Sequence, residues 1–416
     1  MDKEKMKKKI FVSAYACEPN LGSEIGVGWR WVLEMSKYFE LWVLTRASNK
    51  KSIEPWIEEH PQFKNIHFLY YDLPDWAKWW KKGQRGVRIY YNLWQWLSNG
   101  IVKRTMMANN IQIFHHVTYG NALWKVSSYG QSKKFIWGPI GGLETIPNEF
   151  TRLYSVKWRF IEWLRRFTVK MLPLNYGFHK RCQSADLIIC KTQATFNLIP
   201  DKDRKKAILM TDVAVDSDPY TSSASSKTPD GMVRYITIGR LDAWRGFDLA
   251  IEAFDRLAQR HSNVEFCILG KGSEKKKLQE FIGRLPSKEK IKMLGQVSHD
   301  EYTRLLQETD VVVNAALKEG AVTVMFDSLA MGKPMVCVET GGYTRMLTDK
   351  VAEIVELDSR ERVVNRLFNG MERFYDENSR KQVANEASQL LTSLNWEHKG
   401  WAIRDAVETV ISDVND

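Results

Sequence analysis

The sequence is poor in cysteine and has no long apolar run. Its five cysteines among 416 residues are scattered, odd in number and without a Cys-x-x-Cys pair. This pattern argues against a disulfide framework and a zinc site, and it suits a reducing cytoplasm. No apolar stretch approaches the roughly 20 residues that span a bilayer. The run at 10–16 follows a basic start but is too short for a signal peptide, so we expect a buried first strand.

The charge of the chain is unbalanced towards the positive side. Lys and Arg number 61 against 50 Asp and Glu, a net of +11, in a chain that is 44% hydrophobic and 27% charged. The composition is that of a soluble globular protein, and the length suggests two to three domains. A basic surplus favours nucleic acid, an anionic membrane or phosphorylated substrates as partners. The sequence contains no recognised nucleic-acid-binding motif, which argues against the first of these.

Apolar runs that predict strands alternate with helix-like stretches along the whole chain. Most are continuously apolar, as in strands buried on both faces of a parallel sheet, and the stretches between them supply crossover helices. The segment 216–231 is rich in Ser, Thr, Asp and Pro and is predicted to link two doubly wound domains. The predicted strands are 9–16, 40–45, 65–73, 111–117, 134–140 and 187–192 before the linker, and 234–239, 264–270, 290–295, 310–316, 334–339 and 352–356 after it.

Two arginines lie in the loop that follows the first strand of the second half. Parallel sheets bind ligands at the carboxyl ends of their strands, and this loop, with Gly239, Arg240 and Arg245, opens a helix. A helix N-terminus and guanidinium groups both favour anions, so the loop is a candidate diphosphate site; the alternative is two solvated loop arginines. After the next strand, Gly270-Lys271-Gly272 would let a bound group approach the backbone, or would form only a turn.

Two carboxylates follow the fourth strand of the second half. Glu319 precedes Asp327 by about two helical turns, so both fall on roughly one helix face. One carboxylate, with Gly320 beside it, would reach a sugar and the other a ribose diol; the alternative is an acid favoured by the helix dipole and an ordinary surface Asp. The loop after the next strand offers backbone N–H groups to an anion, and it comprises Thr340, Gly341 and Gly342.

Taken in order, these motifs resemble the retaining glycosyltransferases of family 4, which have the GT-B fold. The resemblance covers about 233–349 and rests on the arginine loop, Gly-Lys-Gly, the carboxylate pair with Ala-Met-Gly-Lys-Pro, and Thr-Gly-Gly. It implies that Arg240 and Arg245 bind the donor diphosphate, that Glu319 contacts the donor sugar and that Asp327 contacts the ribose. Three positions depart from the family pattern: Arg245 replaces a lysine, Asp327 a glutamate, and Gly-Ala-Val stands where the family has Gly-Phe-Gly.

The first half offers a glycine-containing turn that opens a helix after the first strand. The resemblance places a Gly-Gly-x-Glu motif here, and it assigns donor binding to Gly22. Gly26 and Gly28, further along, are better explained by close helix packing. Another loop, Trp-Gly-Pro-Ile-Gly-Gly-Leu-Glu, follows a later strand and looks like a loop of many family members. The candidates for the acceptor side are Glu24, Gly141, Gly142 and Glu144.

Two adjacent histidines end the strand predicted at 111–117. Adjacent residues of a strand point to opposite faces, so at most one of His115 and His116 is expected to be functional. The resemblance places a histidine that contacts the donor sugar at this strand end, and His116 fits that position. We therefore count His116 with Glu319, Arg240 and Arg245 as the candidate catalytic residues.

Aromatic and basic residues concentrate in the first part of the chain. Thirteen of the sixteen tryptophans fall at or before Trp163, and the segments 75–97 and 152–172 carry five and six basic side chains against one acidic each. Basic amphipathic helices of this kind lie at membrane interfaces, so we expect the first domain to rest on an anionic membrane; the alternative is that these aromatics pack on the sheet. The second segment has opposed helical faces, Phe160, Leu164, Phe167 and Met171 against Arg159, Glu162, Arg166 and Lys170.

The sequence as a whole predicts an α/β protein with the GT-B fold, two Rossmann-like doubly wound domains that face each other across a cleft. We expect an acceptor domain at 1–215, a donor domain at 216–395, and a last helix at 396–416 that packs back towards the first domain. The expected function is retaining transfer of a sugar from a nucleotide-diphosphate sugar to a glycan or lipid-linked acceptor, in cell-surface polysaccharide or glycolipid assembly. The expected location is the inner face of the cell membrane. No metal or other cofactor is expected, because no clustered Asp-x-Asp motif stands in a plausible place.

Other functions stay open at the level of sequence. A nucleotide-sugar 2-epimerase would share the fold and need no acceptor site. A phosphorylase would need pyridoxal phosphate, and no lysine is singled out for it. A non-catalytic basic protein that binds a membrane or nucleic acid is a further alternative.

Overall fold

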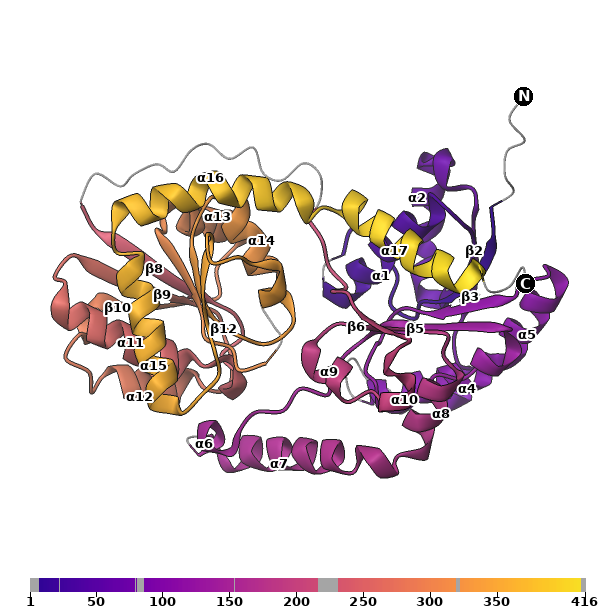
Figure 1. Ribbon diagram of the computed structural model, residues 1–416, viewed down its shortest axis with the longest axis horizontal. Helices are drawn as coiled ribbons and strands as arrows, with labels where there is room; N and C mark the ends of the chain where they lie inside the picture. Colours follow the sequence, from indigo (N-terminus) through magenta and orange to yellow (C-terminus); the bar gives the residue numbers. More distant parts are fainter. Residues whose placement is uncertain are drawn as a thin grey trace. The chain divides into compact units, whose positions relative to one another are not determined.

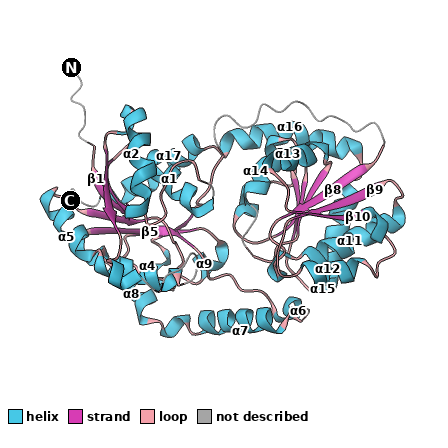
Figure 2. Cartoon of the chain, turned by 180° about the vertical axis from the view of Figure 1, so that it is seen from behind, coloured by secondary structure: helices cyan, strands magenta, loops and turns pink. Residues whose placement is uncertain are grey.

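The chain folds into two compact units, each a parallel sheet with helices on both faces (Figure 1, Figure 2). This confirms the predicted α/β class. The computed structural model describes residues 7–21, 23–78, 80, 86–152, 154–215, 231–318 and 322–412. The first unit comprises Met1–Leu143, Met171–Ala214 and Trp396–Asp416, and the second comprises Glu144–Lys170 and Val215–Asn395.

The first sheet has seven parallel strands in the described part of the chain, in the order β3-β2-β1-β4-β5-β6-β7. The order reverses between β1 and β4, where doubly wound sheets bind their ligands. Strands β1 and β4 pair from Ile10 with Ile113 to Ser13 with His116, which brings both histidine positions to this point. The strands are β1 (Lys9–Ser13), β2 (Glu40–Arg46), β3 (Ile66–Tyr71), β4 (Ile113–His116), β5 (Lys134–Ile140), β6 (Leu187–Cys190) and β7 (Ala207–Leu209).

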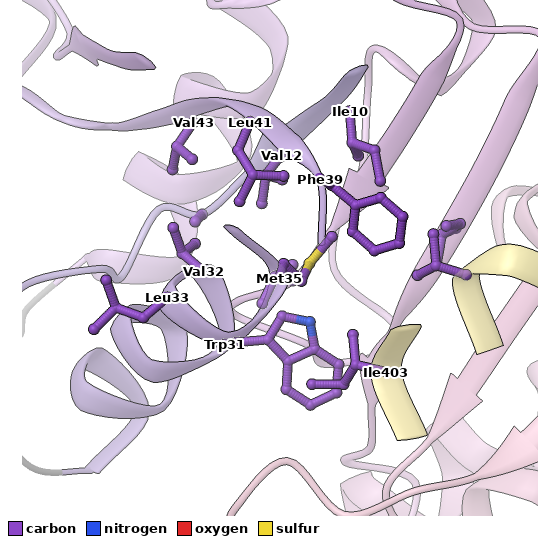
Figure 3. Packing of buried hydrophobic residues seen from close by; sticks show 14 of the residues in the cluster. Ile10, Val12, Trp31, Val32, Leu33, Met35, Phe39, Leu41, Val43 and Ile403 are labelled. Atoms are coloured by element: carbon purple, nitrogen blue, oxygen red, sulfur yellow. The ribbon is translucent and has the colours of Figure 1, made fainter. Parts of the chain in front are cut away.

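The core of the first unit lies between its sheet and two helices that are far apart in sequence. Helices α1 (Ser23–Ser36) and α17 (Trp396–Ser412) pack on each other over one face of the sheet. Figure 3 shows Trp31 and Ile403 from these helices beside Val12 and Leu41 from the strands. Each such buried side chain contributes about 1.5–3 kcal/mol. The other helices are α2 (Lys50–Glu59), α3 (Asp75–Lys78), α4 (Val87–Leu97), α5 (Asn99–Ala108), α8 (Tyr176–Ser184), α9 (Gln193–Asn197) and α10 (Asp201–Arg204).

The second sheet has six parallel strands among the described residues, in the order β10-β9-β8-β11-β12-β13. The order reverses between β8 and β11. The strands are β8 (Val233–Ile238), β9 (Val264–Leu269), β10 (Ile291–Gly295), β11 (Val311–Asn314), β12 (Met335–Val338) and β13 (Ala352–Val355). One face carries α11 (Phe247–Arg260), α12 (Lys275–Ile282) and α15 (Arg360–Arg373), and the other carries α13 (His299–Glu308), α14 (Val322–Ala330) and α16 (Glu377–Ser393) (Figure 1).

Several helices begin where a polar side chain caps the first turn. Asn175, Ser298 and Asp376 each accept a hydrogen bond from the backbone N–H three residues on, at the starts of α8, α13 and α16. Such a cap satisfies a backbone donor that the helix leaves unpaired and contributes about 1 kcal/mol. Polar residues at these positions therefore fix where the helices start.

The segment between Glu144 and Lys170 lies in the second unit, whereas the sequence analysis placed it in the first domain. It contains α6 (Asn148–Thr151) and α7 (Val156–Lys170). Trp158 Nε1 donates to Ser273 Oγ at 3.2 Å, and Lys318 Nζ donates to Glu162 Oε1 at 2.5 Å. These contacts join residues far apart in sequence, which local patterns do not reveal. The predicted linker at 216–231 lies outside the described residues except for its last residue.

Candidate functional site

Glycines bring the strand ends of the second sheet into close backbone contact. Gly239 and Gly270, which follow β8 and β9, have φ of +152° and +137°. A Cβ on Gly270 would lie 1.8 Å from the carbonyl oxygen of Gly239, and one on Gly272 would lie 2.4 Å from that of Leu241. Only glycine permits both the conformation and the distance. The predicted glycine loops are thus required by backbone packing at the carboxyl edge of the sheet, and exposed Lys271 lies between Gly270 and Gly272.

The two predicted diphosphate arginines differ in their surroundings. The Arg240 side chain is 73% exposed, and its Nη2 lies 2.8 Å from Asp242 Oδ2. Arg245 is half-buried against the ring of Trp244, with Cζ 4.4 Å from the ring centroid, and burial lowers the pKa of its guanidinium. Within the described residues, its buried Nε and Nη1 have no hydrogen-bond partner. A guanidinium with buried, unused donors is a strong site for an anion.

Of the predicted carboxylate pair, the structure describes one member. Glu319 and Gly320 lie outside the described residues. Asp327 lies on α14, is 8% exposed, and accepts a hydrogen bond from the Tyr302 hydroxyl of α13. Burial raises the pKa of the Asp327 carboxyl, and the Tyr302 hydrogen bond opposes that shift. Sequence patterns give no signal for this Tyr302 contact, because the two residues lie on different helices.

The loop after β12 already holds a carboxylate. The N–H of Gly341, which has φ of +67°, donates to Glu339 Oε1, and the Thr344 hydroxyl donates to the same oxygen at 2.6 Å. The Thr340 N–H donates to Thr344 Oγ1 at 3.4 Å, and Gly342 begins the following turn. The N–H of Gly341 therefore contacts an anionic group, and that group is the chain's own Glu339 side chain. A phosphate at Gly341 would have to displace this carboxylate.

A buried ion pair lies next to the arginine loop, and the sequence analysis did not predict it. The side chains of Lys318 and Glu162 are 10% and 1% exposed, and their nearest N and O atoms are 2.5 Å apart. Lys318 Nζ also lies 5.3 Å from the centroid of Trp244. Burial lowers the pKa of Lys318, and the charge of Glu162 opposes the shift. The sequence places Glu162 on the polar face of this helix, and at Glu162 that face is buried in the second unit.

In the first unit, His116 is buried at the end of β4. It is 1% exposed, and its Nε2 lies 3.2 Å from the Tyr91 hydroxyl. Within the described residues its Nδ1 has no hydrogen-bond partner. Burial lowers the pKa of His116 to about 3, so the ring is neutral at pH 7. His115 is equally buried, and its Nε2 carries a proton that is donated to the Gly138 carbonyl oxygen at 2.8 Å.

Glu24, another predicted residue of the first half, lies in the same unit as His116. Glu24 is half-buried in the first turn of α1, and its charge raises the pKa of Tyr91, the partner of His116. Glu24 and His116 therefore share one region. Gly22 lies outside the described residues.

The two glycine candidates for the acceptor side pack against Asn121. Gly141 forms a bridge with Asn121, and a Cβ on Gly142, at φ of +87°, would lie 2.3 Å from Asn121 Nδ2. Both belong to the first unit, whereas Glu144, 9% exposed, belongs to the second. The helix-packing interpretation of Gly28 is confirmed, because a Cβ there would lie 2.0 Å from the Ala16 carbonyl oxygen.

Solved structures with this fold include several glycosyltransferases. Sucrose-phosphate synthase from Thermosynechococcus elongatus aligns with 98% of this chain and 100% of its own, with a TM-score of 0.65 at 13% identity. The Anabaena protein Alr3699/HepE in complex with UDP aligns with 97% and 100%, with a TM-score of 0.57 at 15% identity. These similarities confirm the predicted GT-B fold.

Sequence relatives match about a third of the chain. The phosphatidylinositol N-acetylglucosaminyltransferase GPI3 subunit of Saccharomyces cerevisiae is 25% identical over 142 residues, 34% of this chain and 31% of its own. Alpha-D-kanosaminyltransferase of Streptomyces kanamyceticus is 25% identical over 154 residues, 37% and 39% of the two chains. The chain thus spans about a third of the length of the curated relatives it matches. Residues 221–389 match the family model described as glycosyl transferases group 1, so the chain contains a glycosyltransferase domain of this family.

Proposed function

We propose that the chain is a retaining glycosyltransferase of family 4 that takes its sugar from a nucleotide diphosphate sugar. The observation that carries this proposal is Arg245, a half-buried guanidinium whose buried Nε and Nη1 have no partner in the described chain, on the same loop as Arg240. Leaving such donors unused is costly, so an anion is the expected occupant. The group 1 domain and the similar Anabaena protein in complex with UDP support a nucleoside diphosphate as that anion.

In the proposed reaction, the bond between the anomeric carbon and the diphosphate oxygen breaks, and the diphosphate leaves with the electron pair. Arg240 and Arg245 stabilise the charge that develops on it, a contribution that is usually large in enzymes. An acceptor hydroxyl bonds to the anomeric carbon on the face that the diphosphate leaves, and its proton passes to the departing diphosphate. Glu319 orients the donor sugar, Asp327 accepts from the ribose diol, and the neutral ring of His116 contacts the sugar.

Thermal shifts with nucleotides test the donor class. A ligand that binds only the folded chain raises the melting temperature, so UDP or GDP should raise it. UMP and GMP, which lack the second phosphate, are the matched controls and should have a much smaller effect. If the mono- and diphosphates act equally, or if none acts at millimolar concentration, the diphosphate site is wrong. Turnover without any acceptor would favour an epimerase on the same fold.

We also propose that α7 places the enzyme on an anionic membrane, where it meets a lipid-linked acceptor. Phe160, Trp163 and Phe167 are 60%, 54% and 49% exposed, and their rings stack in a row with centroids 5.8 Å apart. Basic side chains of the same helix flank this row, and Lys170 ends it. An exposed aromatic ridge beside basic residues is the pattern of an interfacial helix. The name of the yeast relative, which includes phosphatidylinositol, supports a lipid acceptor.

In the other predicted membrane segment, 75–97, only some of the described tryptophans are exposed. Trp76 and Trp96 are exposed, but Trp94 is fully buried and donates to the Tyr71 carbonyl oxygen, so its assignment to a membrane surface was wrong. Trp79 and residues 81–85 lie outside the described residues. Among the residues that the structure covers, none of the helices combines the length and the apolar character of a bilayer span. The proposed attachment therefore rests on α7.

Vesicle co-sedimentation tests the attachment. The chain should bind phosphatidylglycerol-containing vesicles and release them as salt rises, because each basic residue near anionic lipid contributes about 1 kcal/mol. The double variant Phe160→Ser, Trp163→Ser should bind at least tenfold more weakly. The matched control, Tyr375→Ser, changes a half-buried aromatic of the same unit, on the turn after α15. Binding that ignores lipid charge, or that survives the double change, would contradict the proposal.

A further inference from the structure

Glu162 is the one acidic residue of α7, and it faces inward. Its Oε1 lies 2.5 Å from Lys318 Nζ, and Arg165 Nε lies 3.9 Å from its Oε2. Taking two charges out of water is expensive, and well-packed apolar side chains often give equal or greater stability at such a position. Stability alone is therefore a weak reason for an ion pair here. The contact of Lys318 with Trp244, which Arg245 also contacts, suggests a functional reason for the ion pair.

Lys318 and Arg245 lie against the same indole ring. The centroid of Trp244 is 5.3 Å from Lys318 Nζ and 4.4 Å from Arg245 Cζ. The backbones of the two loops are tightly packed, because the Leu317 N–H donates to the Trp244 carbonyl oxygen at 3.0 Å. A Cβ on Gly246 would come within 2.0 Å of the Ala315 carbonyl oxygen. Two cations thus share one ring in a place with little room for either to move.

We propose that Glu162 is a positioning residue for Arg245. Its carboxylate neutralises Lys318, so that the ammonium and the guanidinium can both remain at Trp244. Without that counter-charge the Lys318 ammonium is unpaired beside the ring that Arg245 also contacts, where water is largely excluded and screening is weak. Arg245 is thereby held with its unused N–H groups available to an anion. The inference rests on the proposed function, because it takes Arg245 as the ligand of the donor diphosphate.

The first experiment measures nucleotide affinity of the full chain by titration calorimetry, with UDP or with GDP, whichever the unmodified chain binds. Glu162→Gln keeps the shape of the side chain and removes its charge, and we expect about tenfold weaker binding. Glu162→Gln combined with Lys318→Met also removes the unpaired ammonium, and we expect it to recover most of the affinity. The matched control is Glu386→Gln, which removes the exposed partner of Lys350 in the same unit and should change nothing.

An Arg245→Ala background separates positioning from general damage. This variant keeps Arg240 and should still bind the nucleotide measurably. Adding Glu162→Gln should then cause no further loss, because no guanidinium remains to be held. An equal loss in both backgrounds would overturn the positioning role and leave the proposed function intact. If Arg245→Ala alone binds as well as the unmodified chain, the diphosphate role of Arg245 and the inference both fail.

Folding of the variants is checked by melting curves before each titration. If Glu162→Gln does not stay folded at the assay temperature, Glu162→Asp takes its place. Aspartate keeps the charge but is one methylene shorter, so we expect a smaller loss of affinity that also disappears in the Arg245→Ala background. A loss that persists in that background has the same meaning as before and overturns the inference.

Discussion

Arg240 and Arg245 carry the same charge on one loop, but only Arg245 is withdrawn from water. Hydrogen bonds from a desolvated guanidinium are stronger, so Arg245→Ala should reduce turnover about 100- to 1000-fold. Arg240→Ala should also reduce turnover, by a smaller factor. Arg245→Lys keeps the charge without the planar fork and should recover only part of the loss. Turnover measured at saturating donor and acceptor decides this, and equal effects at the two positions would contradict the ranking.

Substitutions of Asp327 and Glu319 should differ in their effects on nucleotide affinity and on turnover. Asp327→Ala removes the proposed ribose acceptor and the acceptor of the Tyr302 hydrogen bond, so nucleotide affinity should fall and stability should drop by about 1–3 kcal/mol. Tyr302→Phe removes the same hydrogen bond but keeps the carboxylate, and it is the control for stability. Glu319→Gln should slow turnover far more than it weakens nucleotide binding. Equal losses of rate and affinity for Glu319→Gln would reduce that residue to a binding role.

The buried histidines make the folded chain sensitive to acid. Burial lowers the pKa of His115 to about 4 and that of His116 to about 3, whereas an unfolded histidine titrates near 6.5. Between these values the unfolded chain binds more protons, so stability falls as pH falls, by up to about 1.4 kcal/mol per pH unit for each group. Melting temperatures from pH 7 to pH 4 should therefore fall less steeply for His116→Gln. The control His398→Gln changes an exposed histidine and should keep the original slope.

The arginine loop and the glycines were predictable from sequence because strand, loop and helix follow one another locally. The residues that surround Arg245 in the folded chain, namely Trp244, Lys318 and Glu162, were not predictable in this way. Lys318 and Glu162 are 156 positions apart, and the amphipathic period of α7 places Glu162 on the polar face without indicating its partner. Trp244 gave no signal, because a tryptophan after a strand is equally expected in a core. Pairings across elements depend on tertiary packing, which a single sequence does not encode in its spacing.

At the scale of elements, each predicted strand corresponds to an observed one, because continuous apolar runs mark strands buried on both faces. The observed strand β7 was not predicted. It has three half-buried residues at the edge of the first sheet, too short a run for a periodic signal. Helix α7 was predicted as amphipathic, and its exposed aromatic face agrees, but its place in the second unit was not foreseen.

The crossing of α1 and α17 depends on a glycine. A Cβ on Gly400 would lie 2.5 Å from Oε2 of the buried Glu34, so Gly400→Val should displace this carboxylate and cost about 1–3 kcal/mol. Ala402→Val places valine on the exposed side of α17 and serves as the control, although it loses up to about 0.7 kcal/mol of helix propensity that Gly400→Val does not lose. Scanning calorimetry should show a larger drop in melting temperature for the first variant. Equal melting temperatures for the two variants would mean that the contact between Gly400 and Glu34 tolerates a larger side chain.

On the scale of the whole molecule, both units are assembled from separate stretches of the chain. The first closes with α17 after the second has been completed in sequence, and the second includes α7, which precedes all of the described strands of that unit. Val215 and Asn395 pair by a β-bridge, so the chain's last two transitions between units lie side by side. A cut at the predicted linker would therefore separate each sheet from a helix that belongs to it.

Because a ribosome makes the chain from its N-terminus, the first unit is begun early and finished late. The side chains of Trp396, Ile403 and Val407 belong to its core, yet roughly 180 residues of the second unit are made before them. At a synthesis rate of about 5–20 residues per second, the apolar surface of α1 and the first sheet remains without α17 for roughly 10–40 s. During translation this surface is the part of the nascent chain that most needs a chaperone. A ribosome-bound chain that ends at Asn395 should accordingly be cut by protease within its first unit more readily than the released protein.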